Sequence, residues 1–163
     1  MDIMKSAPVE PGVGVGVFKL KKHINDYFDV ILQYNFQKFN PLEEDYSSHG
    51  YLKSPFEIVY RFGTFIEVSF HSFNGKLMRI VVQNDFKGKL DDNIVVGMDL
   101  DKVRNGTWYY DNDDECYRSP QLSGVEITAD PYFKFVESIS VYIPEMDALK
   151  MGDSAQKFML GKW

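Results

Sequence analysis

Three apolar runs between residues 56 and 83 constrain the fold of this chain more than any other feature. The runs FEIVYRF, TFIEVSFHSF and KLMRIVVQ are rich in β-branched and aromatic residues. Within each run, apolar and polar residues tend to alternate. Gly63 separates the first two runs, and Asn74-Gly75 separates the second from the third. Asn-Gly is the dipeptide most typical of a tight turn between antiparallel strands. The sequence therefore predicts a meander of three antiparallel strands.

The segment before this meander has helical spacing. Apolar residues recur at intervals of three and four from Lys22 to Phe39, which predicts one long, mostly buried helix that ends at Asn40-Pro41. The following stretch, from Pro41 to Pro55, is polar and punctuated by proline and glycine. We expect a loop there.

The second half of the chain starts with the same order of elements. NIVVGMDLDKVRNG predicts a strand, a glycine and one or two helical turns, in which Leu100 and Val103 lie three residues apart and Gly106 ends the helix. Three further strand-like runs follow, TWYYDNDDECYR, GVEITAD and KFVESISVYI. Ser119-Pro120 and Asp130-Pro131 separate them.

The two halves share a pattern of apolar positions. Residues 18–27 align with residues 94–103, and Leu77-x-x-Ile80-x-Val82 aligns with Val136-x-x-Ile139-x-Val141. We therefore expect a single α+β domain over residues 1–163, built of two related strand-helix-three-strand units, about 12–88 and 92–144. Each unit is too small to cover its own sheet, so the antiparallel sheets should join edge to edge or share a core, with the long helix on one face. We expect residues 145–163 to form a tail with a short helix over 146–151.

Composition and charge narrow the functional classes. The net charge of −6 argues against a surface that neutralises nucleic-acid phosphates. It suits a basic partner, or it only keeps a small protein soluble. The N-terminus has no apolar run of a secretory signal, no run is long enough to span a membrane, and Cys116 is the single cysteine. We expect a cytoplasmic protein that contacts neither a membrane nor nucleic acid directly.

No segment has the spacing of a known catalytic or cofactor motif. The glycines of PGVGVGVFKL form G-x-G-x-G before a strand, whereas a dinucleotide fingerprint is G-x-G-x-x-G after one. The three histidines are scattered, and Cys116 lies among acidic residues that would raise the pKa of its thiol. We therefore expect no catalytic residue, cofactor or metal. The alternative is a small enzyme or ligand-binding domain whose site lies between the two units and uses residues such as His71, Glu67 and Tyr132.

One segment in the second half of the chain, WYYDNDDECY, is rich in both acidic and aromatic side chains. It places four carboxylates among four aromatic rings, and it lacks the glycine and the final glutamate of a calcium loop. It is either an ordinary solvated hairpin tip or a recognition surface, in which rigid aromatic rings supply contact area and carboxylates pair with arginine or lysine. The candidate partner-binding residues are Trp108, Tyr109, Tyr110, Asp111, Asp113, Asp114, Glu115 and Tyr117, with a smaller acidic copy at Glu43, Glu44, Asp45 and Tyr46.

The starts VGVGVFKL and NIVVGMDLDKV, and GVEITAD with its closing I-x-V strand, resemble a group of small bacterial immunity proteins. The G-M-x-h-x-x-V start also resembles the tandem modules of beta-lactamase inhibitor protein-like families. The resemblance implies a cytoplasmic inhibitor that protects a cell from a toxin of contact-dependent growth inhibition or a related polymorphic system. It implies neutralisation by binding, in which the protein occludes the active site of a cognate toxin, here a basic nuclease domain. Immunity families share no catalytic residues, so the resemblance implies none in this chain.

Overall fold

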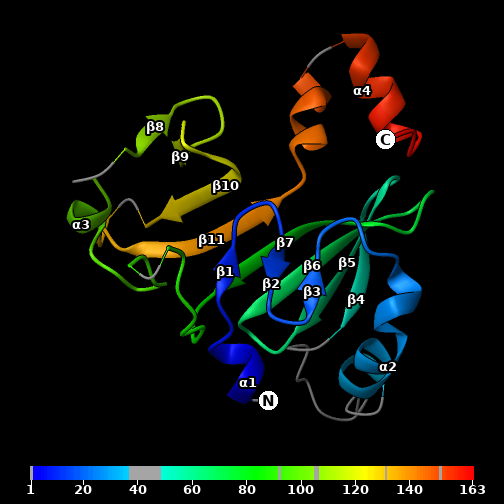
Figure 1. The fold of residues 1–163 in the computed structure, drawn as a ribbon, viewed down its shortest axis with the longest axis horizontal. Helices are drawn as coiled ribbons and strands as arrows, with labels where there is room; N and C mark the ends of the chain where they lie inside the picture. Colours follow the sequence, from blue (N-terminus) through cyan, green and yellow to red (C-terminus); the bar gives the residue numbers. More distant parts are fainter. Residues whose placement is uncertain (1, 37–48, 92, 105–106, 131, 151) are drawn as a thin grey trace.

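The computed structural model describes residues 2–36, 49–91, 93–104, 107–130, 132–150 and 152–163. It is a mixed α/β structure with two antiparallel sheets, one of three strands and one of eight (Figure 1). The mixed fold with antiparallel sheets is the one that the sequence predicted.

The larger sheet has the strand order β4-β5-β6-β7-β11-β10-β9-β8. Its strands are β4 (Gly50–Ser54), β5 (Glu57–Phe62), β6 (Ile66–His71), β7 (Leu77–Gln83), β8 (Tyr109–Asp111), β9 (Cys116–Ser119), β10 (Leu122–Ala129) and β11 (Val136–Tyr142). Two four-stranded meanders therefore meet where the last strand of each half pairs with the other. Val82 lies opposite Ile139, and Ile80 lies opposite Val141.

Two strand predictions in this sheet were wrong. β4 lies inside the stretch expected to be a loop. It is an edge strand whose five residues are all half-buried or exposed, so it lacks the apolar alternation that marks a buried strand. The run TWYYDNDDECYR is not one strand but the hairpin of β8 and β9, because the chain reverses at residues 112–115.

The glycine-rich segment forms a small sheet of its own. Its strands are β1 (Val9–Glu10), β2 (Gly14–Val15) and β3 (Phe18–Lys19), so the glycines allow two tight turns rather than entry into one opening strand. Gly14 has φ +148°, and a Cβ there would lie 2.0 Å from the backbone oxygen of Phe18. Close backbone packing thus explains Gly14, whereas Gly12 and Gly16 have φ values of +68° and +55°, which favour glycine in the turns.

The expected long helix is not confirmed. Residues 24–36 form three consecutive short segments, the 3₁₀ helix η1 (Ile24–Tyr27), the α-helix α2 (Phe28–Ile31) and the π-helix η2 (Leu32–Phe36). His23 and Asp26 form a capping box at the start of η1. Tyr27 and Ile31 are buried in these segments, but Phe28 is 61% exposed, so the helix is not mostly buried. Its expected end at residues 39–41 lies outside the described residues.

The other helical segments are short. They are α1 (Asp2–Lys5), α3 (Leu100–Arg104), the 3₁₀ helix η3 (Pro144–Lys150) and α4 (Gly152–Met159). The predicted helix around Leu100 and Val103 is confirmed, whereas residues 94–96 form no strand beyond a single bridge from Ile94 to Leu90. The tail contains η3 and α4, so its helical content is larger than the single short helix expected. No helix in the described part of the chain has the length and apolar character that a membrane crossing requires.

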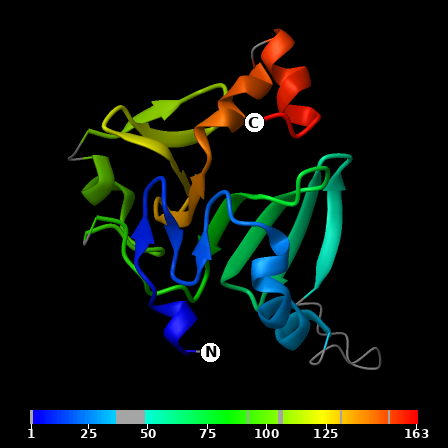
Figure 2. The same ribbon diagram turned by 45° about the vertical axis from the view of Figure 1, so that its right-hand side comes forward.

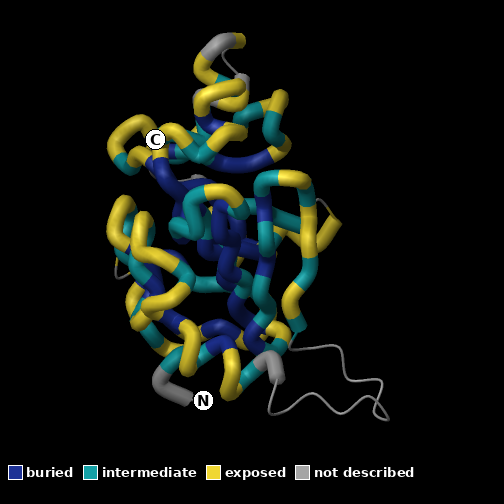
Figure 3. Tube along the Cα trace, turned by 90° about the vertical axis from the view of Figure 1, so that its right-hand side faces the viewer, coloured by how far each residue is buried: buried dark blue, intermediate teal, exposed yellow. Residues whose placement is uncertain are grey.

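The main core lies between one face of the large sheet and the N-terminal elements. Val15 and Phe18 of the small sheet and Tyr27 and Ile31 of the helical segment share this core with the strands, so both elements cover the same face (Figure 2). A second, smaller cluster contains Met78, Ile143 and Phe158, and it fixes the C-terminal tail. Buried residues run through the middle of the molecule, while the loops and the tail carry most of the exposed ones (Figure 3).

Candidate recognition site

The acidic, aromatic segment forms the hairpin β8–β9 at one edge of the large sheet. Tyr110 pairs with Tyr117, while Tyr109 pairs with Arg118 and Asp111 with Cys116. Residues that pair across two strands point to the same face, and successive residues point to opposite faces. The hairpin therefore presents its tyrosine pair on one face and the Arg118 side chain on the other.

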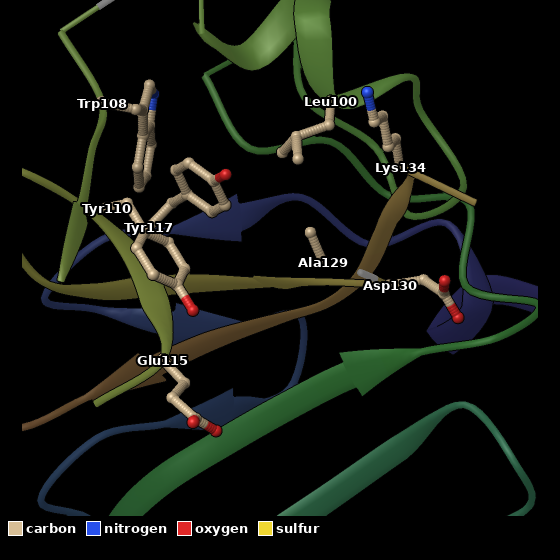
Figure 4. Close-up of a pocket in the computed structure, with 8 residues that line it drawn as sticks. All are labelled: Leu100, Trp108, Tyr110, Glu115, Tyr117, Ala129, Asp130 and Lys134. Atoms are coloured by element: carbon tan, nitrogen blue, oxygen red, sulfur yellow. The ribbon is translucent and has the colours of Figure 1, made fainter. Parts of the chain in front are cut away.

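The tyrosine face of the hairpin forms one wall of a pocket of about 550 Å³ (Figure 4). The rings of Tyr110 and Tyr117 are 5.1 Å apart between centroids and inclined by 58°. This is a favourable aromatic contact, and it holds the two rings together in the same wall. The pocket is lined by Leu100, Trp108, Tyr110, Glu115, Tyr117, Ala129, Asp130 and Lys134. Elements from three parts of the chain thus build it, namely α3, the hairpin and the turn between β10 and β11.

The other face of the hairpin is held by Arg118. Its guanidinium lies 2.5 Å from Asp114 and 3.5 Å from each of Asp111, Glu126 and Asp147. Glu126 is buried on β10 and also binds Arg79 of β7. We call these six residues the Arg118 network; it ties the hairpin to the middle of the sheet and to η3.

A second pocket, of about 360 Å³, lies beside the Arg118 network, and Cys116 and Tyr142 line it. Burial raises the pKa of the Cys116 thiol, and nearby carboxylates including Glu126 also raise it. Burial, together with Asp147, raises the pKa of Tyr142 to about 12. Both groups are therefore protonated near neutral pH, and Cys116 is a poor nucleophile.

The structure divides the predicted partner-binding residues into three groups. Trp108, Tyr110, Glu115 and Tyr117 line the 550 Å³ pocket. Asp111 and Asp114 belong to the Arg118 network, while Tyr109 and Asp113 are exposed on the hairpin. The second predicted patch, Glu43, Glu44, Asp45 and Tyr46, lies outside the described residues.

The residues suggested for an enzyme or ligand site are not brought together. His71 is fully buried against Phe158 and Trp163, with ring centroids 5.6 and 5.8 Å away. Glu67 binds Arg61, and Tyr132 is 87% exposed in the turn between β10 and β11. That turn lies near the end of β7, whereas His71 lies near its start. The two halves also join within one sheet, so no gap separates them at the β7–β11 junction.

Sequence reasoning missed the far wall of the pocket. Leu100, Ala129, Asp130 and Lys134 are separated from the hairpin along the chain, and no motif spacing connects them to it. The one available signal was Asp130-Pro131, a turn dipeptide followed directly by Tyr132 and Phe133. Only the folded sheet brings this turn beside the hairpin.

Within the described residues, no group of three or more histidine, cysteine, aspartate and glutamate side chains is arranged to hold a metal ion. The fold and the site together define a mixed α/β protein with an aromatic and acidic pocket at one edge of a large antiparallel sheet.

Comparison with known proteins gives one structural likeness. No protein-family model matches the sequence, and no curated protein matches it. A cysteine-rich secretory protein from Staphylococcus aureus subsp. aureus Mu50 is similar in structure, with a TM-score of 0.48 and 12% sequence identity. The likeness covers 88% of this chain and 48% of that chain, so this chain spans about half the length of that neighbour.

Proposed function

We propose that this chain is an immunity protein that binds and neutralises a cognate secreted antibacterial toxin. In this proposal the toxin domain is a basic nuclease, and the chain occludes its active site through the β8–β9 hairpin and the adjoining pocket. The protein then acts in the cytoplasm, where the toxin would meet its nucleic-acid substrate. We also propose that the chain is built of two related units. The pairing of β7 with β11, the closing strands of the two units, supports this second point.

The observation that carries the proposal is the combination of carboxylates and exposed aromatic rings on the hairpin. Tyr109 and Tyr110 are 52% and 47% exposed, which is unusual for rings that serve only to fill a core. The carboxylates of Asp113 and Glu115 are exposed beside them. Aromatic residues dominate the energetics of protein interfaces, and clustered charges of one sign accelerate association with a partner of opposite charge.

Co-expression with the toxin encoded next to this gene tests the proposal. Cells that produce the toxin alone should die, cells that also produce this chain should grow, and the two proteins should purify as one complex. Growth arrest despite soluble, folded chain would overturn the proposal.

The second candidate is a domain that binds a small ligand. It is favoured by the size of the 550 Å³ pocket and by the titratable groups of Glu115, Asp130 and Lys134 in its lining. A ligand-binding domain would not rescue the toxin-producing cells, so the same experiment separates the two candidates.

A further inference from the structure

We infer that the 550 Å³ pocket receives an arginine side chain of the partner. This inference rests on the proposed function to the extent that the partner is a basic protein. It assigns a ligand class to the pocket, and it adds Leu100 and Asp130 to the recognition surface, although neither belongs to the hairpin.

The walls of the pocket suit a flat cation. Trp108, Tyr110 and Tyr117 line one side, and in Figure 4 their rings lie close together, across from Leu100 and Ala129. A guanidinium group stacks on the faces of tryptophan and tyrosine, and the attraction increases as water is excluded. Leu100 and Ala129 provide apolar contacts for the methylene groups of the same side chain.

The charged groups of the pocket favour a cation over an anion. Two carboxylates, Glu115 and Asp130, stand against the single ammonium group of Lys134. Asp130 accepts hydrogen bonds from the backbone N–H groups of Tyr132 and Phe133 at 2.8 and 2.7 Å, which hold its carboxylate in place. In Figure 4, Glu115 and Lys134 lie at opposite corners of the pocket, so the lysine leaves the hairpin side to an incoming cation.

Arginine fits this lining better than lysine. Its planar guanidinium can stack on a ring and donate hydrogen bonds to a carboxylate at the same time, whereas an ammonium group is compact and strongly hydrated. Arginine is also enriched at the centres of protein interfaces, together with tyrosine and tryptophan. The aromatic walls therefore select an arginine among the basic side chains of the partner.

The test is a titration of the full chain with N-acetyl-L-arginine amide, followed by the NMR signals of the two tryptophan indole N–H groups. The Trp108→Phe variant assigns the signals, and Trp163, far from the pocket in the C-terminal tail, is the internal reference. The neutral analogue N-acetyl-L-citrulline amide has the same shape without the charge. The arginine probe should shift the Trp108 signal with a Kd of roughly 1–10 mM, and citrulline should bind about tenfold more weakly or worse.

Matched variants locate the binding. Glu115→Gln, which removes one charge from the pocket, should weaken the arginine probe by about three- to tenfold. Asp113→Asn removes a charge from the same hairpin but not from the pocket lining, and it should change the Kd less than about twofold. Tyr110→Leu, an exposed position, should weaken binding in a second independent way. Thermal unfolding checks that each variant is folded.

Three results would overturn the inference: no shift of the Trp108 signal at 50 mM probe, equal responses to arginine and citrulline, or equal losses in Glu115→Gln and Asp113→Asn. Such a failure leaves the rescue of toxin-producing cells unaffected, so it is distinct from a failure of the proposed function. Rescue without arginine binding would place the interface elsewhere on the molecule.

Discussion

Replacing Arg118 by glutamine is expected to destabilise the protein more than any other exchange of a charged side chain in the second meander. The Arg118 side chain is 18% exposed and lies within 3.5 Å of four carboxylates, among them the buried Glu126. Without the guanidinium these carboxylates face one another across a partly buried space. Removing one partner of a buried ion pair typically costs about 3–5 kcal/mol.

The lower end of this range applies here, because Glu126 keeps its contact with Arg79. We therefore expect Arg118→Gln to lower the free energy of unfolding by about 3 kcal/mol. For a domain of 163 residues this corresponds to a decrease in Tm of roughly 6–12 °C. Urea unfolding followed by circular dichroism measures the free energy, and a constant m-value indicates that the native and denatured states keep their compactness.

Arg61→Gln is the matched control. Arg61 binds one carboxylate, Glu67, and its side chain is 40% exposed. Exposed ion pairs contribute about 0–1 kcal/mol, so Arg61→Gln should cost no more than about 1 kcal/mol. If the two variants lose equal stability, or if Arg118→Gln stays within 1 kcal/mol of the wild type, the Arg118 network does not hold the hairpin as described.

Three further predictions follow from the structure. Reversing charge at Asp113 and Glu115 together, each to lysine, should weaken partner binding at least tenfold at low salt, mainly through slower association; Asp29→Lys, on α2 far from the hairpin, should leave binding unchanged in the same surface plasmon resonance assay. Trp163→Ala should lower the free energy of unfolding by about 2 kcal/mol, because the Trp163 ring stacks on Phe158 with 5.6 Å between ring centroids and covers His71. An unchanged midpoint of urea unfolding would show that the tail does not contribute to stability. Burial lowers the pKa of His71 in the folded protein. As the pH falls below about 6.5, the unfolded state therefore binds a proton before the folded state does. The free energy of unfolding then decreases, by at most about 1.4 kcal/mol per pH unit. Urea midpoints between pH 7.5 and 5.5, where carboxylates stay ionised, should show a decline that His71→Phe reduces; equal slopes in both proteins would refute the role of His71.

The choice of Asp113 and Glu115 for the charge reversal depends on the structure. Asp113 and Asp114 are adjacent and chemically equivalent in sequence, and both are candidate partner-binding residues. The structure places Asp114 2.5 Å from Arg118, whereas Asp113 is exposed. A lysine at position 114 would face the Arg118 guanidinium, so Glu115 replaces Asp114 in the test of binding.

Local pattern in the sequence was sufficient for much of the fold. The alternating runs at residues 56–83 are β5, β6 and β7, and Asn74-Gly75 lies in the turn between the last two of them. A Cβ at Gly75 would lie 2.3 Å from Nε2 of His23, and its φ of +67° suits glycine, so the same turn also receives the start of η1. Strand β4 escaped prediction, because an exposed edge strand has no apolar face to reveal it. The division of TWYYDNDDECYR into β8 and β9 was also missed, because the alternation of apolar residues does not show where the chain reverses.

The sequence by itself determined most of the strands of the large sheet, where several turns fall and where carboxylates and aromatic rings are concentrated, because each of these depends on neighbours within a few residues. The tertiary structure decided that β7 pairs with β11, that Arg118 holds Asp111 and Asp114, and that Asp130 and Leu100 close a pocket beside Tyr110 and Tyr117. These contacts join residues far apart in the chain, and many alternative pairings satisfy the same local pattern. Only the packing of the whole sheet selects among them, because register and strand order are set by the sum of contacts across both faces.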